Sequence, residues 1–228
     1  MKVLGIETST QAGSIALIDE EEIISEYSYQ GPLEHSAWLM PAIDKLLKDA
    51  NLSCQDIEGI AISSGPGSFT GLRIGISTVK GLVQGLKIPV VGISTLDSLA
   101  CNLPYTEKII CPVLDARKKE VYTALYKIDI SVQVATDERL TDYLVISPQK
   151  LIEMISQPTI FLGSALKLYE EQIRHSLKDK ACFAPLPLWL PRASNLALLG
   201  LRQLKAGRQE DIYSFTPLYL RKVIVQGQ

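Results

Sequence analysis

The sequence predicts an α/β fold with two lobes. Three short apolar strands lie at the N-terminus and are joined by tight polar turns, which predicts an antiparallel meander. Helices with an apolar face then alternate with apolar strands, which is the pattern of parallel strands linked by crossover helices. The first hundred residues therefore have the element order βββαβαβα, and a shorter α/β lobe follows.

The first lobe is expected over residues 1–103. The helix over 36–50 is predicted because its apolar residues, from Leu39 to Ala50, fall on one face. The helix over 68–86 is predicted in the same way from Leu72, Ile76 and Val79, and it follows the breaker Ser64-Gly-Pro-Gly67. The remaining elements of this lobe are strands over 3–7, 14–18, 22–27, the residues before 63, and 89–93, and a short helix over 95–101.

The second lobe is expected over residues 104–228, with the boundary near Pro104 and the tail returning to the first lobe. Residues 115–119 are predicted to form the hairpin turn between its first two strands. Three prolines within residues 185–191 indicate an extended loop. The other expected elements are strands over 108–114, 120–126, 140–145 and 160–162, and helices over 148–155, 166–176 and 194–206.

Composition narrows the possible partners. The chain has 228 residues, 46% of them hydrophobic, which is enough for one large or two small cores. Its 23 Lys and Arg nearly balance 25 Asp and Glu, so the net charge of -2 gives no general attraction for a phosphate backbone. No apolar run reaches the ~18 residues of a membrane span, and the start is too short for a signal-peptide core. The four cysteines form no C-x-x-C pair, so we expect reduced thiols in a cytoplasmic protein.

Three segments identify a family. The first is Leu4-Gly-Ile-Glu-Thr-Ser-Thr10, and the second is Ser64-Gly-Pro-Gly-Ser-Phe-Thr-Gly-Leu-Arg-Ile-Gly75. The third combines Asp115-Ala-Arg117 and Glu120-Val-Tyr122 with Pro217-Leu-Tyr-Leu-Arg221. Together they resemble the TsaB (YeaZ) family over nearly the full length, and the twelve-residue second segment is too long to recur by chance.

The resemblance implies a fold, a function and partners. The fold would be the two-lobed fold of the actin, hexokinase and Hsp70 class (ASKHA), with a shortened second lobe. The function would be that of a non-catalytic paralogue of TsaD, the enzyme that makes N6-threonylcarbamoyladenosine (t6A) at position 37 of tRNA. The chain would pair with TsaD as its dimerization subunit, TsaE would join the pair, and tRNA would be bound only through the complex. Alone, the chain would form homodimers.

The sequence lacks the residues that the TsaD reaction needs. TsaD-type enzymes hold a metal with an H-x-x-x-H helix, and the two matching positions here are Thr95 and Leu99, which cannot replace two imidazoles. The only histidines are His35 and His175, and no G-x-S-x-G elbow occurs. His35 is interpreted as an N-terminal helix residue bonded to nearby backbone. We therefore expect no metal and no catalytic residue.

The turn after the first strand is the candidate nucleotide site. Thr8, Ser9 and Thr10 follow Glu7 in the place of the first phosphate hairpin of the ATPase class. No G-G-G loop follows Lys108, so no cofactor is expected for this chain alone, and ATP or ADP would bind only at the partner interface. The alternative function is a degenerate ATP-binding phosphotransferase of the ASKHA class, with Asp115 as the candidate base. Residues 64–67 have two interpretations, an anion cradle and a tight turn.

The two long helices are the candidate partner surface. One stripe of the second helix carries Gly71, Gly75, Gly81 and Gly85, each of which costs roughly 0.5–1 kcal/mol relative to Ala. Either the chain's own first helix or another subunit could approach this stripe. Trp38 lies off the apolar arc, either as an interface residue or over a local groove. The partner-binding residues implied are Trp38, Met40, Gly71, Arg73, Gly75, Ser77 and Lys80.

Direct tRNA binding is a third hypothesis, weakened by the net charge. Basic residues could still form a local patch, and Asp115 and Arg117 are expected to pair at a strand end. Arg221 is expected to hold the tail to the body. The residues of the possible patch are Lys118, Lys119, Arg202, Lys205, Arg208, Arg221 and Lys222.

Overall fold

The computed structural model describes residues 1–31, 34–128 and 138–221. The chain forms two compact units. Unit 1 contains Met1–Asn102 and Leu190–Pro217, and unit 2 contains Leu103–Trp189 and the tail from Leu218. The helix expected over 194–206 therefore belongs to unit 1 and not to the second lobe, where it was expected. None of the described helices is long and apolar enough to cross a membrane.

Unit 1 is built on a five-stranded sheet with the order β3-β2-β1-β4-β5. The first three strands are antiparallel, and β4 and β5 run parallel to β1, as the βββαβαβα order predicts. All residues of β1 and β2 are buried, because helices cover both faces of the sheet. The strands are β1 (Val3–Glu7), β2 (Gly13–Ile18), β3 (Ile23–Tyr29), β4 (Gly59–Gly65) and β5 (Val90–Ser94).

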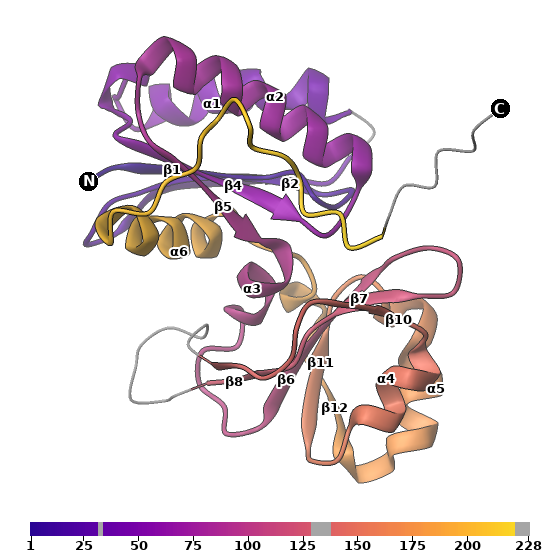
Figure 1. The fold of residues 1–228 in the computed structure, drawn as a ribbon. Coiled ribbons are helices and arrows are strands. Elements are labelled where there is room, and N and C mark those ends of the chain that lie inside the picture. The colour runs from indigo at the N-terminus through magenta and orange to yellow at the C-terminus, as the bar shows by residue number, and fades with distance from the viewer. Residues whose placement is uncertain (32–33, 129–137, 222–228) are drawn as a thin grey trace, which may run out of the picture. The chain divides into compact units, whose positions relative to one another are not determined.

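Two long helices lie side by side on one face of this sheet, and a third covers the other (Figure 1). The pair is α1 (His35–Asp49) and α2 (Phe69–Leu86). The Ser68 hydroxyl caps α2 by accepting a bond of 3.2 Å from the Gly71 amide. The short elements are the 3-10 turn η1 (Cys54–Asp56) and α3 (Thr95–Ala100), which follows β5.

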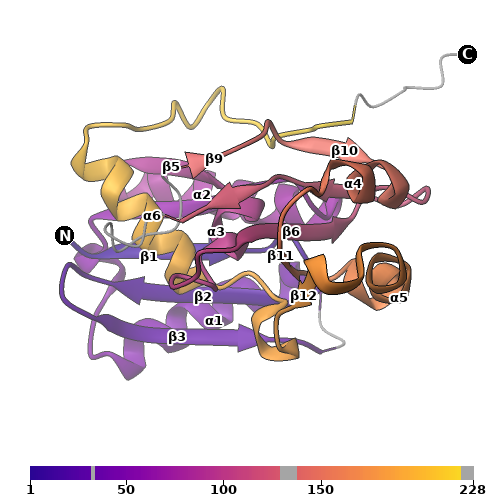
Figure 2. The same ribbon diagram turned by 90° about the horizontal axis from the view of Figure 1, so that it is seen from below.

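The opposite face is covered by α6 (Ala193–Lys205), which lies across the central strands (Figure 2). Small residues allow this close packing. A Cβ atom on Gly5 would lie 2.4 Å from the Ala193 carbonyl oxygen, and one on Gly200 would lie 2.3 Å from the Ala61 Cβ. The segment after α6 then follows β5, where the Glu210 amide donates to the Val90 carbonyl over 2.8 Å.

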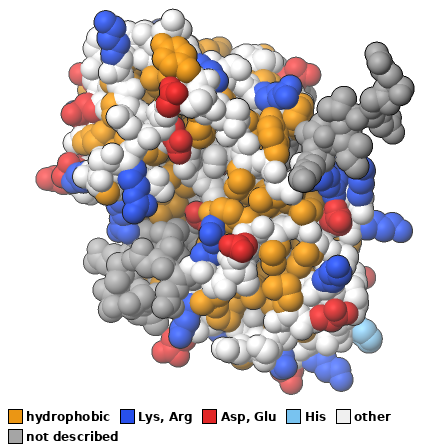
Figure 3. Space-filling view, in the orientation of Figure 1, with side chains coloured by type: hydrophobic (Ala, Val, Ile, Leu, Met, Phe, Trp, Pro, Cys, Tyr) orange, Lys and Arg blue, Asp and Glu red, His pale blue; other side chains and the backbone are white. Residues whose placement is uncertain are grey.

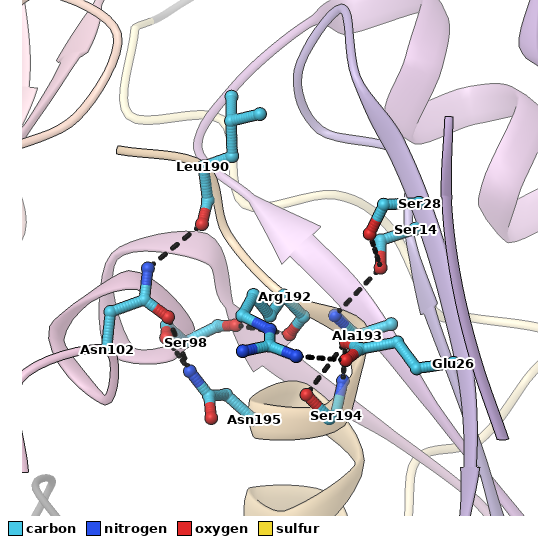
Figure 4. A network of polar contacts seen from close by, with 10 residues as sticks. All are labelled: Ser14, Glu26, Ser28, Ser98, Asn102, Leu190, Arg192, Ala193, Ser194 and Asn195. Atoms are coloured by element: carbon cyan, nitrogen blue, oxygen red, sulfur yellow. Dashed lines mark hydrogen bonds and ion pairs between the residues drawn. The ribbon is translucent and has the colours of Figure 1, made fainter. Parts of the chain in front are cut away.

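A polar network fixes the start of α6 (Figure 4). The Glu26 carboxylate of β3 accepts from the Ser194 amide (3.1 Å) and hydroxyl (2.8 Å), and it pairs with Arg192. This carboxylate therefore caps the helix, which offers unpaired amides at its N-terminus. The Asn102 side chain donates to the Leu190 carbonyl over 2.9 Å, joining the points where the chain leaves unit 1 and returns to it.

Unit 2 holds a seven-stranded sheet with the path β10-β7-β6-β11-β12. Strands β6, β11 and β12 are parallel, while β7 and β8 pair antiparallel with β6. Side chains of α4 and α5 form its core with Cys111, Val113 and Phe161 of the sheet. The elements are β6 (Ile109–Asp115), β7 (Val121–Thr123), β8 (Tyr126–Lys127), β9 (Glu138–Arg139), β10 (Leu144–Ile146), α4 (Pro148–Met154), β11 (Thr159–Leu162), α5 (Leu166–Leu177), η2 (Lys178–Lys180), β12 (Ala181–Phe183) and η3 (Leu186–Leu188).

Several details of unit 2 differ from expectation, and the two-residue strand β9 was not predicted. The strand expected over 120–126 is divided into β7 and β8. Strand β12 was not predicted, because three residues show no periodicity. The segment expected as an extended loop contains the 3-10 turn η3, which begins after Pro185.

Candidate functional site

The turn after β1 is folded against the start of α2. The Ser9 amide donates to the Glu7 carboxylate over 2.6 Å, and the Thr8 amide donates to the Ser63 hydroxyl over 3.2 Å. The Ser68 amide in turn donates to the Ser9 carbonyl over 2.6 Å. The amide of Ser68, the residue before α2, therefore binds the chain's own turn, which supports the tight-turn interpretation of residues 64–67.

Three glycines make this contact possible. A Cβ atom would lie 2.2 Å from the Ser9 carbonyl oxygen if placed on Gly67, and 2.1 Å from the Thr8 carbonyl oxygen if placed on Gly71. On Gly75 it would lie 2.3 Å from the Thr8 hydroxyl oxygen. Gly71 and Gly75 are buried, and their nearest neighbours belong mainly to the β1–β2 turn, which was not expected. The first helix takes part only at its start, where the His35 ring would lie 3.2 Å from a Cβ atom on Gly71.

The same packing covers the residues of the expected phosphate hairpin. Thr8 and Ser9 are buried, and their hydroxyl oxygens have no hydrogen-bond partner among the described residues. Thr10 is half-buried and donates its hydroxyl to the Ala12 carbonyl over 2.9 Å. The turn therefore does not fit a phosphate-binding hairpin, because a phosphate arriving from solvent could not reach the buried hydroxyl groups of Thr8 and Ser9.

Glu7 is a fully buried carboxyl group at the end of β1. One of its oxygens accepts from the Ser9 amide, and the other has no partner among the described residues. Removal from water raises the pKa of Glu7 above its ordinary value, while the hydrogen bond from the Ser9 amide opposes this change. Burial thus favours the neutral acid at this position.

The positions that match the metal ligands of TsaD-type enzymes lie in the core. Thr95 and Leu99 of α3 are both fully buried, and the Thr95 hydroxyl has no described partner. In residues 1–31, 34–128 and 138–221, no group of three or more His, Cys, Asp or Glu side chains is arranged to hold a metal ion. His35 donates from Nε2 to the Thr10 carbonyl over 2.8 Å, which confirms its predicted bond to nearby backbone.

The first helix does not present Trp38 to solvent as a free ring. Its ring stacks on Tyr29 of β3, with centroids 5.7 Å apart and planes 21° from parallel. A Cβ atom on Gly13 would lie 2.7 Å from the same ring, so the ring fills a groove over β2. Met40, by contrast, is 47% exposed.

The second helix carries an exposed row with a spacing of four residues, which we call the outer row of α2. Its members are Phe69, Arg73, Ser77, Gly81 and Gly85. The Arg73 guanidinium lies 3.9 Å from the centre of the Phe69 ring, an attractive cation–π contact. Gly81 and Gly85 have open space where a Cβ atom would be, since nothing lies within 4 Å. Lys80 stands beside the row, half-buried, with Nζ 3.5 Å from the Tyr213 carbonyl oxygen.

The residues expected to bind a partner thus fall into two groups, those exposed on the outside of the helix pair and those packed against the chain itself. Arg73, Ser77 and Met40 lie on the outside of the helix pair, whereas Gly71, Gly75 and Trp38 contact the chain itself. Phe69, which is 44% exposed, was not among the residues expected to bind a partner. Its spacing of four residues from Arg73 was the available signal, because such positions lie on one helical face.

The comparisons with known proteins agree with this fold. The family model for TsaD, tRNA N6-adenosine threonylcarbamoyltransferase, matches residues 29–227. The tRNA threonylcarbamoyladenosine biosynthesis protein TsaB of Bacillus subtilis (strain 168) is 36% identical over 97% of this chain and 94% of that protein. The solved structure of YeaZ from Pseudomonas aeruginosa has a TM-score of 0.79 at 27% identity, covering 96% of this chain and 99% of that chain.

A more distant solved structure places the fold in its wider class. The activator of the 2-hydroxyisocaproyl-CoA dehydratase from Clostridium difficile has a TM-score of 0.51 at 11% identity, covering 91% of this chain and 97% of that chain. This likeness concerns the fold alone, and the expected ASKHA-type α/β fold is confirmed. From the full-length identity and the family model, the chain belongs to the TsaB (YeaZ) family of tRNA threonylcarbamoyladenosine biosynthesis proteins.

Proposed function

We propose that this chain is a non-catalytic subunit of the t6A synthesis complex, and that it pairs with a TsaD homologue through the outside of α1 and α2. A TsaE homologue would join this pair. Family membership supports a role in the t6A pathway. The match of the TsaD family model to residues 29–227 supports a common fold for the two proposed partners.

The outer row of α2 is the observation that carries the pairing proposal. Protein interfaces are rich in aromatic residues and Arg and poor in acidic residues, and this row has Phe69 and Arg73 and no carboxylate. Gly81 and Gly85 cost roughly 0.5–1 kcal/mol each in helix stability, and no described atom of the chain approaches them. A helix of another subunit can lie close to such positions, which accounts for glycine there.

The proposed lack of catalysis is supported by what surrounds the expected chemical positions. Thr95 and Leu99 are core residues, and the β1–β2 turn is covered by α2. A phosphotransferase would instead need Asp115 as a base for a substrate hydroxyl. The Asp115 carboxylate accepts from the Arg117 amide over 2.8 Å and pairs with the Arg117 guanidinium over 3.3 Å, so it already serves its own turn.

Calorimetry separates these two functions. If the chain is a non-catalytic subunit, we expect that it does not bind ATP with micromolar affinity when isolated. Any ATP or ADP should then bind at the interface with the TsaD homologue. The titration is made with the chain alone and with the mixture. Micromolar binding by the chain alone would favour the phosphotransferase instead.

Co-purification with a tagged TsaD homologue tests the pairing surface. The variant Met40→Glu with Arg73→Glu places two carboxylates on the outside of α1 and α2, where both side chains are exposed. We expect it to lose the partner and to melt like the unmodified chain. Trp38 is unsuitable for this test, because its ring packs on Tyr29 and its loss would disturb the fold.

The matched control is Leu168→Glu with Arg202→Glu. These residues lie on α5 and α6, Leu168 is 63% exposed and Arg202 is exposed. The control makes the same chemical changes away from α1 and α2, so it should retain the partner. A Met40 and Arg73 variant that still binds the TsaD homologue as tightly as the unmodified chain would refute this surface.

A further inference from the structure

The turn between β6 and β7 has an unusual backbone. Arg117, Lys118 and Lys119 have φ angles of 59°, 51° and 61°. These are left-handed values, which L residues other than Asn and Asp avoid because Cβ approaches the following carbonyl. Glycine or asparagine would form such a turn more easily. The need to turn the chain therefore does not explain why three basic residues occupy it.

The acidic residues beside the turn serve to hold it. The Asp115 carboxylate accepts from the Arg117 amide and pairs with its guanidinium. The Glu120 amide donates to the Arg117 carbonyl over 3.0 Å. The Glu120 carboxylate pairs with Arg221, the residue that was expected to hold the tail to the body. Among the described residues, no carboxylate lies within ion-pair distance of Lys118 or Lys119, and both side chains are exposed.

The charge of the chain is unevenly divided between the units. Unit 2 contains 13 Lys and Arg against 11 Asp and Glu, a formal charge of +2, whereas unit 1 contains 10 against 14, a charge of -4. Lys and Arg side chains gather at the edge of unit 2 where β6 and β7 join (Figure 3). The small net charge of the whole chain therefore does not exclude a basic region on unit 2. Lys222, also expected in a patch, lies outside the described residues.

We propose that the β6–β7 turn, Arg117–Lys119, is a contact for the phosphate backbone of RNA when the chain is part of its complex. The inference rests on the proposed function, because the complex acts on tRNA. Basic side chains on a fixed turn bind phosphates and position a nucleic acid without reading its bases. A protein partner fits the turn less well, because Ala116 and Val121 are buried and no exposed apolar side chain within 115–121 could anchor it.

The salt dependence of tRNA binding tests this contact. The complex is reconstituted with the TsaD and TsaE homologues, and tRNA affinity is measured by fluorescence anisotropy over a range of salt concentrations. The variant Lys118→Gln with Lys119→Gln should weaken binding several-fold and reduce the slope of log affinity against log salt by about 1–2, since each lost phosphate contact contributes about 0.7–0.9.

The control is Lys178→Gln with Lys180→Gln. This pair is also exposed, lies in unit 2 and loses the same charge, and Lys178 also has a positive φ of 49°. It should leave the slope unchanged. Co-purification with the TsaD homologue is measured on the same samples. Failure of the unmodified chain to pair would refute the proposed function, whereas normal pairing with an unchanged slope in the Lys118 and Lys119 variant would refute the RNA contact alone.

Two further measurements separate function from folding. Lys118→Gly relieves an unfavourable φ angle, so it should raise the melting temperature by about 2–4 °C while weakening tRNA binding. Opposite changes in the two properties would be difficult to explain by a structural role of Lys118. Loss of TsaE recruitment with unchanged tRNA affinity would assign the turn to a protein partner and overturn the proposal.

Discussion

Replacing Gly71 by alanine is expected to destabilise the chain, although the same change stabilises most helix interiors. Alanine gains about 0.5–1 kcal/mol over glycine within a helix. At Gly71, however, the new Cβ would lie 2.1 Å from the Thr8 carbonyl oxygen, where ordinary contact begins near 3.4 Å. That oxygen belongs to backbone held by the bond from Thr8 to Ser63, so it cannot rotate away.

The magnitude follows from the movement that this overlap requires. Helix α2 must shift from the β1–β2 turn by about an ångström, which strains the core by roughly 1–3 kcal/mol. The shift also weakens the bond from the Ser68 amide to the Ser9 carbonyl, which contributes about 1 kcal/mol. After the gain in helix propensity is subtracted, the net loss is about 1–3 kcal/mol, and the melting temperature should fall by roughly 3–10 °C.

The assay is thermal unfolding followed by circular dichroism, with Gly81→Ala as the control in the same helix. A Cβ atom on Gly81 meets nothing within 4 Å, so this variant should gain about 0.5–1 kcal/mol and melt about 2–4 °C higher. The two variants thus move in opposite directions. If Gly71→Ala melts as high as Gly81→Ala, the close contact between α2 and the turn is not a packing constraint and the reasoning is refuted.

Two further changes test the carboxylates of Glu7, which is buried, and Glu26, which is partly buried. Burial raises the pKa of the Glu7 carboxyl group. The stability that Glu7 contributes should therefore be fully present below pH 4.5, its ordinary pKa, and be lost as the pH rises through the folded-state pKa. In thermal melts between pH 4 and 8, Glu7→Gln should remove this loss. Glu26→Ala should lower the free energy of urea unfolding by about 2–4 kcal/mol, because the Ser194 amide and hydroxyl and the Arg192 side chain lose their acceptor.

Each of these changes has an internal control. Asp19 and Asp49 have lowered pKa values and lose their contributions as pH falls, but they are present in both proteins, so the difference between Glu7→Gln and the unmodified chain isolates Glu7. Equal pH dependence of the two proteins would contradict the raised pKa. Glu26→Gln keeps one acceptor oxygen and should lose less stability than Glu26→Ala.

The order of elements in unit 1 could be predicted because it depends on local pattern. The period of apolar residues locates α1 and α2, and the apolar runs locate β1, β4 and β5. The membership of α6 in unit 1 could not be predicted from that pattern. It depends on the fit of its small residues to Gly5 and Ala61, which are distant in sequence.

The candidate site was predicted only in part, for the same reason. Helical periodicity correctly places Arg73 and Ser77 outside, but it cannot show that Tyr29 provides a stacking surface for Trp38. Nor can it show that Gly71 and Gly75 face the β1–β2 turn. The turn over 115–119 was correct in place, but its left-handed backbone was unexpected, because Arg117, Lys118 and Lys119 are not residues that prefer that conformation.

The return of α6 to unit 1 has a consequence for synthesis on the ribosome. The strands and the helix pair of unit 1 emerge within the first 102 residues, while the helix that covers the other sheet face ends at Lys205. Until then a nascent chain exposes one apolar face of this sheet, including positions opposite Ala193 and Ala197. The first unit to emerge is thus among the last to be completed, and a chain truncated before α6 would aggregate or require a chaperone.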